Sequence, residues 1–313
     1  MQKEFDRPFV QSVLDDISHR MAGEADRGDV ADYIPELASV SLNQFGIAVA
    51  PLDGLPISAG DANVAFSIQS ISKVFSLVVA LDRVGATLWR RVGREPSGDP
   101  FNSIVQLEFE RGKPRNPFIN AGALVVSDVI LQEEEAKSEE HPVLELCRTL
   151  ANDPTIEIDE AVFASEMSTG DRNRALAYFM LAEGNIESGV KATIESYFRQ
   201  CSIEMSCVQL ATATRFLAFA GNQELKEDWK LTPERARRIN ALMMTCGCYD
   251  ASGEVAFRVG LPCKSGVGGG VVASVPGVGS IAAWCPGLDK KGNSVLAMRA
   301  LEEVARELKW SVF

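Results

Sequence analysis

The sequence contains too little histidine for most sites that depend on it. Only two of the 313 residues are histidines, His19 and His141. A metal centre with several histidine ligands is therefore excluded, and Cys246 and Cys248 do not replace them, because one residue separates them instead of the two of a zinc knuckle. The same shortage disfavours a Ser-His-Asp triad, so a serine nucleophile in this chain needs a different base.

Basic side chains are also few. The chain has 31 Lys and Arg against 43 Asp and Glu, a formal net charge of −12. Binding to nucleic acid or to an anionic membrane requires clustered cations that displace counterions, so neither is expected as a main partner. The remaining expectation for this charge is a solvated acidic surface.

Long apolar runs are missing as well. No stretch reaches the roughly 18 residues that a membrane span needs, and the best candidate, Val271 to Cys285, is interrupted by Pro276 and Gly277. The N-terminus lacks the apolar run of a signal peptide. The seven cysteines are odd in number and mostly in apolar surroundings, which is typical of reduced core thiols. We therefore expect a soluble, cytoplasmic protein.

Hydrophobic residues make up 46% of the chain, enough for a sizeable core. Their spacing predicts strands near both ends and helices between them. The predicted strands are 40–51, 63–67, 255–259, 270–275 and 280–284. The predicted helices are 8–22, 70–81, 122–132, 143–150, 159–166, 172–183, 186–201, 207–219, 233–245 and 294–309.

Strands at both ends of a chain are most simply joined in one antiparallel sheet, covered by the terminal helices. The sequence thus predicts an α+β fold with a helical subdomain inserted into an α/β part. The α/β part would comprise about 1–83 and 246–313, and the helical part about 84–245, within a single catalytic domain over 1–313. A cleft between the two parts is where a site is expected.

The first motif with chemical meaning is Gln69-Ser70-Ile71-Ser72-Lys73. It follows a predicted strand and opens a helix, so Ser70 and Lys73 face the same way. The free N–H groups of a helix start stabilise developing negative charge near Ser70. A lysine serves as a base only when its pKa is lowered by burial or by another cation. Taken alone, such a pair more often marks a capped helix with a surface lysine than a catalytic site.

The second motif is Lys264-Ser265-Gly266, followed by Val267 and three glycines. Lys-Ser/Thr-Gly before a C-terminal strand is the other half of serine-lysine sites. A phosphate loop is disfavoured because its Lys-Ser follows the glycines, and a dinucleotide fingerprint because its glycines open a helix. A glycine-rich strand entry that only permits close packing remains the alternative.

Together these motifs resemble the bacterial and mitochondrial-type glutaminase family, which has the β-lactamase/DD-peptidase-like serine hydrolase fold. The resemblance runs from about Asp32 to Val295. Its blocks are Ala31–Pro35, Phe66–Lys73, Glu95–Gly98, Asn116–Ala123, Ser165-Glu166, Gly170–Asn173, Tyr197 with Cys201–Glu204, Cys246–Asp250 and Lys264–Gly270.

The resemblance implies that the chain hydrolyses L-glutamine to L-glutamate and ammonia through a γ-glutamyl ester on Ser70. Lys73 would be the base, and Tyr249, positioned by Lys264, would relay a proton; whether Tyr249 or Lys73 protonates the ammonia stays open. The resemblance implies no cofactor or metal. It does imply that the chain forms a homotetramer or a homodimer. The implied substrate contacts are Tyr33, Gln69, Ser70, Asn120, Glu166, Asn173, Tyr197, Tyr249 and Val267.

Within this set the chemistry of each group suggests a role. Glu166 suits the α-ammonium of glutamine, and the neutral donors suit its α-carboxylate. The N–H groups of Ser70 and Val267 would form the oxyanion hole. A β-lactamase or peptidase on the same fold and a glutamine-sensing protein without catalysis are the alternatives. Read singly, Asn120, Glu166 and Tyr197 are equally well explained as structural residues.

Overall fold

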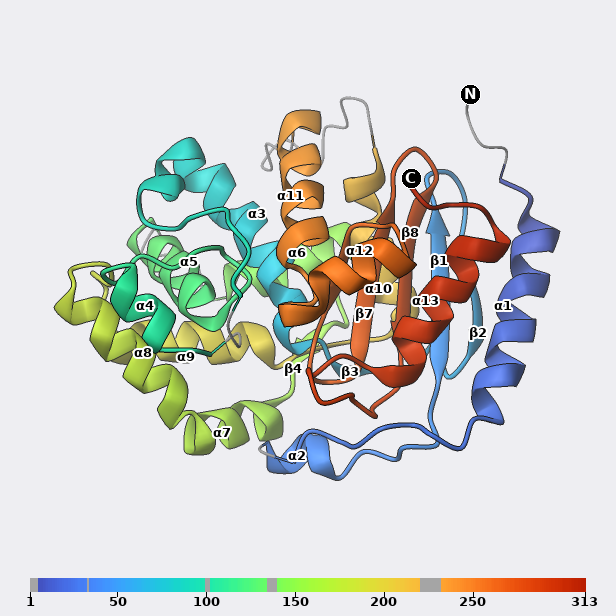
Figure 1. Cartoon of the computed structure of the whole chain (residues 1–313), viewed down its shortest axis with the longest axis horizontal. Helices are drawn as coiled ribbons and strands as arrows, with labels where there is room; N and C mark the ends of the chain where they lie inside the picture. Colours follow the sequence, from blue (N-terminus) through green and yellow to red (C-terminus); the bar gives the residue numbers. More distant parts are fainter. Residues whose placement is uncertain (1–4, 33, 99–101, 134–139, 220–231) are drawn as a thin grey trace.

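A computed structural model describes residues 5–32, 34–98, 102–133, 140–219 and 232–313. Its main sheet is antiparallel, with the strand order β2-β1-β8-β7-β6, so two strands from the N-terminal end of the chain join three from the C-terminal end at the β1–β8 pair (Figure 1). The strands are β1 (Gly46–Pro51), β2 (Ile57–Gly60), β6 (Cys263–Ser265), β7 (Gly270–Val275) and β8 (Gly279–Trp284). The predicted joining of the two chain ends in one sheet is confirmed.

The sheet is buried on both faces, and its side chains divide by period two between two cores. Ile47, Val49 and Ile281 belong to a cluster with the terminal helices α1 (Arg7–Ala22) and α13 (Val295–Glu307). Residues on the opposite face, including Ala48, Ala282 and Trp284, belong to a larger cluster shared with the helical part. The sheet is therefore the middle layer between the terminal helices and the helical part.

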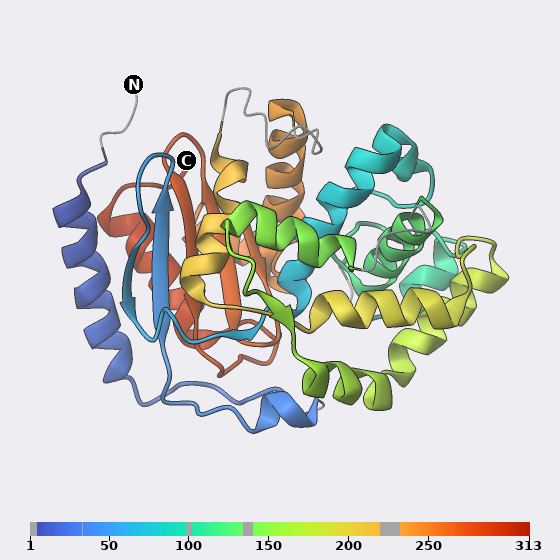
Figure 2. The same ribbon diagram turned by 180° about the vertical axis from the view of Figure 1, so that it is seen from behind.

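The terminal helices begin at side-chain caps. Asp6 accepts a hydrogen bond from the N–H of Phe9, and Ser294 accepts one from that of Ala297. An ion pair of 2.8 Å between Arg20 and Glu303 joins α1 to α13. The two helices lie side by side at one end of the molecule in both views (Figures 1 and 2).

The helical part lies beyond the opposite face of the sheet (Figure 1). Its centre is formed by α3 and α5, which are buried almost all round, and α10 packs directly on β1 and β8. The helices are α2 (Pro35–Ala38), α3 (Ser72–Val84), α4 (Val105–Phe109), α5 (Asn120–Gln132), α6 (Pro142–Ala151), α7 (Glu160–Thr169), α8 (Asp171–Ala182), α9 (Val190–Cys201), α10 (Cys207–Thr214), α11 (Pro233–Cys246) and α12 (Ser252–Arg258), with 3₁₀ turns at Gln69–Ile71, Gly85–Arg90, Arg215–Ala218 and Tyr249–Ala251.

A second, small antiparallel sheet has the order β3-β5-β4. It consists of β3 (Phe66–Ser67), β4 (Glu157–Ile158) and β5 (Ile203–Met205). It fixes the end of the segment that leads into the first motif, because Phe66 pairs with Met205 and Ser67 with Glu204.

The α+β prediction is confirmed, but one predicted strand is wrong. Residues 255–259 lie almost wholly in helix α12. Val255 and Val259 are buried while Phe257 between them is 88% exposed, a pattern that imitates the alternation of a strand. The short strands β2, β4, β5 and β6 were not predicted. In the part of the chain that the structure describes, no helix is long and apolar enough to cross a membrane.

Candidate active site

Ser70 lies in a tight turn between β3 and α3. The residue before it, Gln69, has a φ of 47°, a left-handed conformation that is uncommon outside glycine and often occurs at functional sites. The turn directs the chain from the small sheet into α3, on which Lys73 follows. Both side chains are buried, Ser70 at 6% and Lys73 at 1% exposure.

Lys73 is buried and is held in place by two acceptors. Its Nζ donates to Asn120 Oδ1 at 2.7 Å and to the carbonyl of Phe118 at 3.2 Å. Burial lowers the pKa of Lys73 to about 8, although the neighbouring Cys201 and Glu166 act in the opposite direction. A substantial fraction of Lys73 is therefore neutral near pH 8, as a base requires.

The glycine-rich segment after Lys264 packs backbone to backbone against the Ser70 turn. A Cβ on Gly268 would lie 2.2 Å from the carbonyl oxygen of Ser67, and one on Gly266 would lie 2.5 Å from that of Ile68. Only glycine permits this approach, which brings Val267 to the cavity beside Ser70. The segment is also anchored by Trp284, whose Nε1 donates to the carbonyl of Gly268 at 2.9 Å.

Tyr249 lies next to the nucleophile Ser70, and Lys264 lies next to the Tyr249 ring. Lys264 Nζ donates to the carbonyls of Gly247 (3.0 Å) and Ser265 (2.5 Å), and it lies 4.8 Å from the centre of the Tyr249 ring. Burial, followed by the charge of Lys73, lowers the pKa of Lys264 to about 7. Tyr249 donates to the carbonyl of Ser265 at 3.4 Å and shares a hydrogen bond with Ser70. Its own φ is 56°, and burial raises its pKa well above the usual value.

A cavity of about 160 Å³ opens onto Ser70. Seven of the predicted substrate-contact residues line it: Gln69, Ser70, Asn120, Glu166, Asn173, Tyr197 and Val267. Lys73, Tyr249 and Lys264 are buried around its floor, and Tyr33 lies outside the described residues. The sequence reasoning missed Ile34, Asn102, Thr169, Gly170 and Arg172 in the lining. Ile34, Gly170 and Arg172 stood within motif blocks, a signal that could have identified them.

Asn120 connects the base to the cavity. Its Oδ1 accepts from Lys73 and lies 3.3 Å from the donating hydroxyl of Tyr197, while its Nδ2 donates to Asn173 Oδ1 at 2.9 Å. The side chain therefore has its orientation fixed by partners on α3, α8 and α9.

Glu166 is a buried carboxylate without a close cation. It is 7% exposed and, within the described residues, forms no ion pair. Burial raises the pKa of Glu166 to about 7, and a hydrogen bond from Gln69 and the charge of Lys73 act in the opposite direction. A cationic ligand group in the cavity would satisfy this carboxylate.

The described residues contain no group of three His, Cys, Asp or Glu side chains that could hold a metal ion. All seven cysteines are buried and free, in agreement with the expected core thiols.

Comparisons with known proteins agree with this geometry. A family model described as Glutaminase matches residues 28–313. A relative named Glutaminase from Methylobacterium nodulans is 56% identical over 306 residues, which cover 98% of this chain and 99% of the relative. A solved structure described as "Probable glutaminase ybaS" superposes with a TM-score of 0.90 at 36% identity, over 99% of both chains. A "Probable glutaminase from Bacillus subtilis complexed with 6-diazo-5-oxo-L-norleucine" has a TM-score of 0.85 at 36% identity, over 99% of this chain and 98% of its own.

Proposed function

The chain belongs to the glutaminase family and hydrolyses L-glutamine to L-glutamate and ammonia, and we propose that it does so through a γ-glutamyl ester on Ser70. The observation that carries the proposal is the buried Ser70 one helical turn before a lysine whose pKa is lowered to about 8. This is the arrangement of an activated nucleophile with its base.

In the first step the neutral Lys73 takes the proton of Ser70, and Oγ attacks the side-chain amide carbon of glutamine. The negative charge passes to the amide oxygen, for which the N–H groups of Ser70 and Val267 are the proposed donors. The close approach of the glycine-rich segment to the Ser70 turn supports this pairing.

In the second step the carbon–nitrogen bond breaks and ammonia leaves with a proton from Lys73 or Tyr249. The hydrogen bond between Tyr249 and Ser70, and the contacts of Lys264 with the Tyr249 ring and its acceptor carbonyl, support a relay through the phenol. A water molecule then attacks the ester, with Lys73 again taking a proton, and glutamate is released.

Recognition of the free amino acid falls to the cavity walls. Glu166 is proposed to pair with the α-ammonium, because the buried carboxylate forms no ion pair with any residue that the structure describes. Asn120, Asn173 and Tyr197 are proposed to bind the α-carboxylate, and the same role is proposed for Tyr33. A cavity of about 160 Å³ matches a small substrate and not a peptide or a protein.

Ammonia release from glutamine and asparagine, together with the colour change of a chromogenic β-lactam, tests the substrate. We expect that glutamine alone is turned over at a high rate. Hydrolysis of the β-lactam would instead favour a β-lactamase-like hydrolase. An electrophilic glutamine analogue such as a diazoketone tests the nucleophile. The mass of the analogue less that of the expelled N₂ should be added to the peptide that contains Ser70, and Ser70→Ala should be inactive. Labelling of a cysteine with an active Ser70→Ala would refute the mechanism.

We also propose that the chain is one catalytic domain that works as a homotetramer or homodimer in the cytoplasm, without nucleic acid or membrane as a partner. The seven free, buried thiols support a reducing compartment. Light scattering after gel filtration tests the assembly, and a mass equal to one 33.9 kDa chain at micromolar concentration would refute it.

A further inference from the structure

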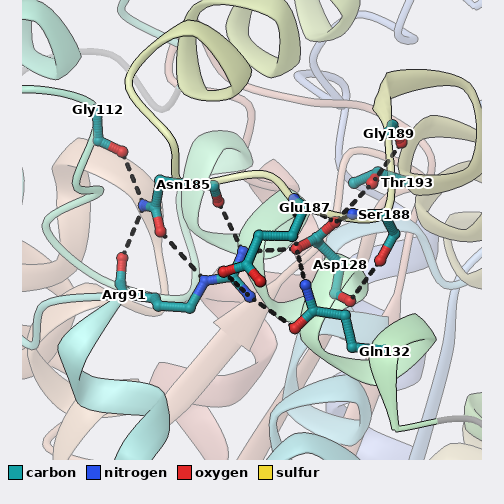
Figure 3. Close-up of polar contacts among 9 residues, drawn as sticks. All are labelled: Arg91, Gly112, Asp128, Gln132, Asn185, Glu187, Ser188, Gly189 and Thr193. Carbon is teal, nitrogen blue, oxygen red and sulfur yellow. Dashed lines mark hydrogen bonds and ion pairs between the residues drawn. The ribbon is translucent and has the colours of Figure 1, made fainter.

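A buried polar network joins four segments of the helical part at a distance from the cavity. Its centre is Asp128 on α5, which is fully buried and pairs with Arg91 at 2.5 Å. Asn185 accepts from Arg91 through its side chain and its carbonyl, and it donates to the carbonyls of Arg91 and Gly112. Figure 3 shows Arg91 reaching the Asp128 carboxylate, with Asn185 bound to Arg91 and to Gly112.

The same carboxylate serves the start of α9. It accepts from the backbone N–H groups of Glu187 (3.1 Å) and Ser188 (2.7 Å), and the hydroxyl of Thr193 lies 3.2 Å from it. Gly189, the residue before α9, supplies no side-chain cap. A carboxylate on α5 therefore supplies the negative charge that the start of α9 favours.

α5 and α9 run antiparallel, and they touch at a second point that belongs to the active site. There Tyr197 on α9 donates to Asn120 on α5, the residue that also binds Lys73. Asn120 and Asp128 are eight positions apart on α5, and Thr193 and Tyr197 are four positions apart on α9. The two contacts are therefore about 12 Å apart along α5 and about 6 Å apart along α9, so the position of α9 that Asp128 fixes through Thr193 also sets the position of Tyr197, one helical turn further on.

We propose that Asp128 is a positioning residue for the reaction, acting through α9 to hold Tyr197 against Asn120 and so to orient the acceptor of Lys73. This inference rests on the proposed function. An exposed ion pair with the same partners would contribute little to stability. Here the carboxylate is wholly buried, and water cannot replace it for the groups that it binds.

The test is a double-mutant cycle on kcat/KM for glutamine. Asp128→Asn keeps the shape of the side chain but removes its charge, and it should lower kcat/KM by about 10- to 100-fold, as expected for a misplacement of the order of 1 Å. In a Tyr197→Phe background the contact with Asn120 is already gone, so the same change should cost less than about 3-fold.

A purely structural role is separated by Val129→Ala, which removes buried methyl groups from the adjacent position of α5 without touching the network. It should lower the melting temperature while leaving kcat/KM within about 3-fold of the parent. If Asp128→Asn does not fold, Thr193→Val is used in the same cycle, with an expected loss of about 3- to 10-fold.

Equal losses from the first substitution in both backgrounds, or losses that follow the melting temperature in every variant, overturn the inference. Failure of the Ser70 mechanism would appear elsewhere, as turnover by Ser70→Ala. The two results are therefore distinguishable.

Discussion

Glu166 should make the protein less stable as the pH rises, and its replacement by glutamine should remove that cost. Burial raises the pKa of Glu166 from 4.5 to about 7, so the folded protein holds this proton more tightly than the unfolded chain does. The stability that depends on the protonated Glu166 is therefore fully present below about pH 4.5 and is lost as the pH rises through 7. A shift of that size corresponds to about 3 kcal/mol above pH 7.

Glu166→Gln retains the shape but has no charge to desolvate. At pH 8 the variant should be more stable than the parent by up to about 3 kcal/mol, and at pH 4.5 the two should be alike. Its activity should fall at the same time, because a neutral amide loses a charge-assisted hydrogen bond to the ammonium. The expected decrease in kcat/KM is roughly 30- to 1,000-fold, from about 2–4 kcal/mol.

The assay is urea unfolding of both proteins at several pH values between 4.5 and 8, combined with kinetics at pH 8. Glu160→Gln is the matched control, because Glu160 lies on the same helix with 71% of its side chain exposed. It should change stability by less than about 0.5 kcal/mol at every pH. If the free energy of unfolding varied with pH in the same way in the parent and in Glu166→Gln, the Glu166 carboxylate would not be desolvated. Normal turnover by the variant would show that Glu166 does not bind the substrate.

Three further outcomes are expected. The reaction requires an ionised Glu166 and a neutral Lys73, whose pKa values are about 7 and about 8. Below pH 7 a plot of log kcat/KM against pH should therefore rise with a slope near two in the parent and near one in Glu166→Gln. The same slope in both proteins would contradict this. Burial lowers the pKa of His141 to about 4, so about 3 kcal/mol of stability should be lost as the pH falls from 6.5 to 4, and His141→Gln should flatten that loss in urea midpoints. Gly268→Ala should reduce kcat/KM more than about 100-fold, whereas Gly253→Ala, whose added methyl meets open space in α12, should be neutral in the same assay.

The sequence could predict the parts of the site that depend on local spacing. Ser70 and Lys73 stand three apart at a helix start, and the glycines after Lys264 mark a close backbone approach, so both features are visible without the fold. Residues such as Ile34, Asn102 and Thr169 carry no chemical signature, and they line the cavity only because distant segments meet there.

The fold was predictable to the same degree. Long periodic helices and the strands β7 and β8 were found, because each buries a continuous face. The strand predicted at 255–259 was wrong because a five-residue segment that is apolar except at Arg258, with valine at both ends, fits either structure when its burial is unknown. Asp128 was not distinguished from other acids, since its partners outside α5, such as Arg91 and Thr193, are brought to it only by the fold.

The seven buried cysteines can be used to measure how often the folded structure opens. Burial raises the pKa of every one of them, so thiolate is scarce in the folded protein, and no thiol is exposed to reagent. Alkylation of the native enzyme should therefore proceed only as fast as the structure opens. Because the cysteines are distributed from α6 to the end of β8, the order in which their peptides acquire the label would map which parts of the molecule open first, with no engineered probe.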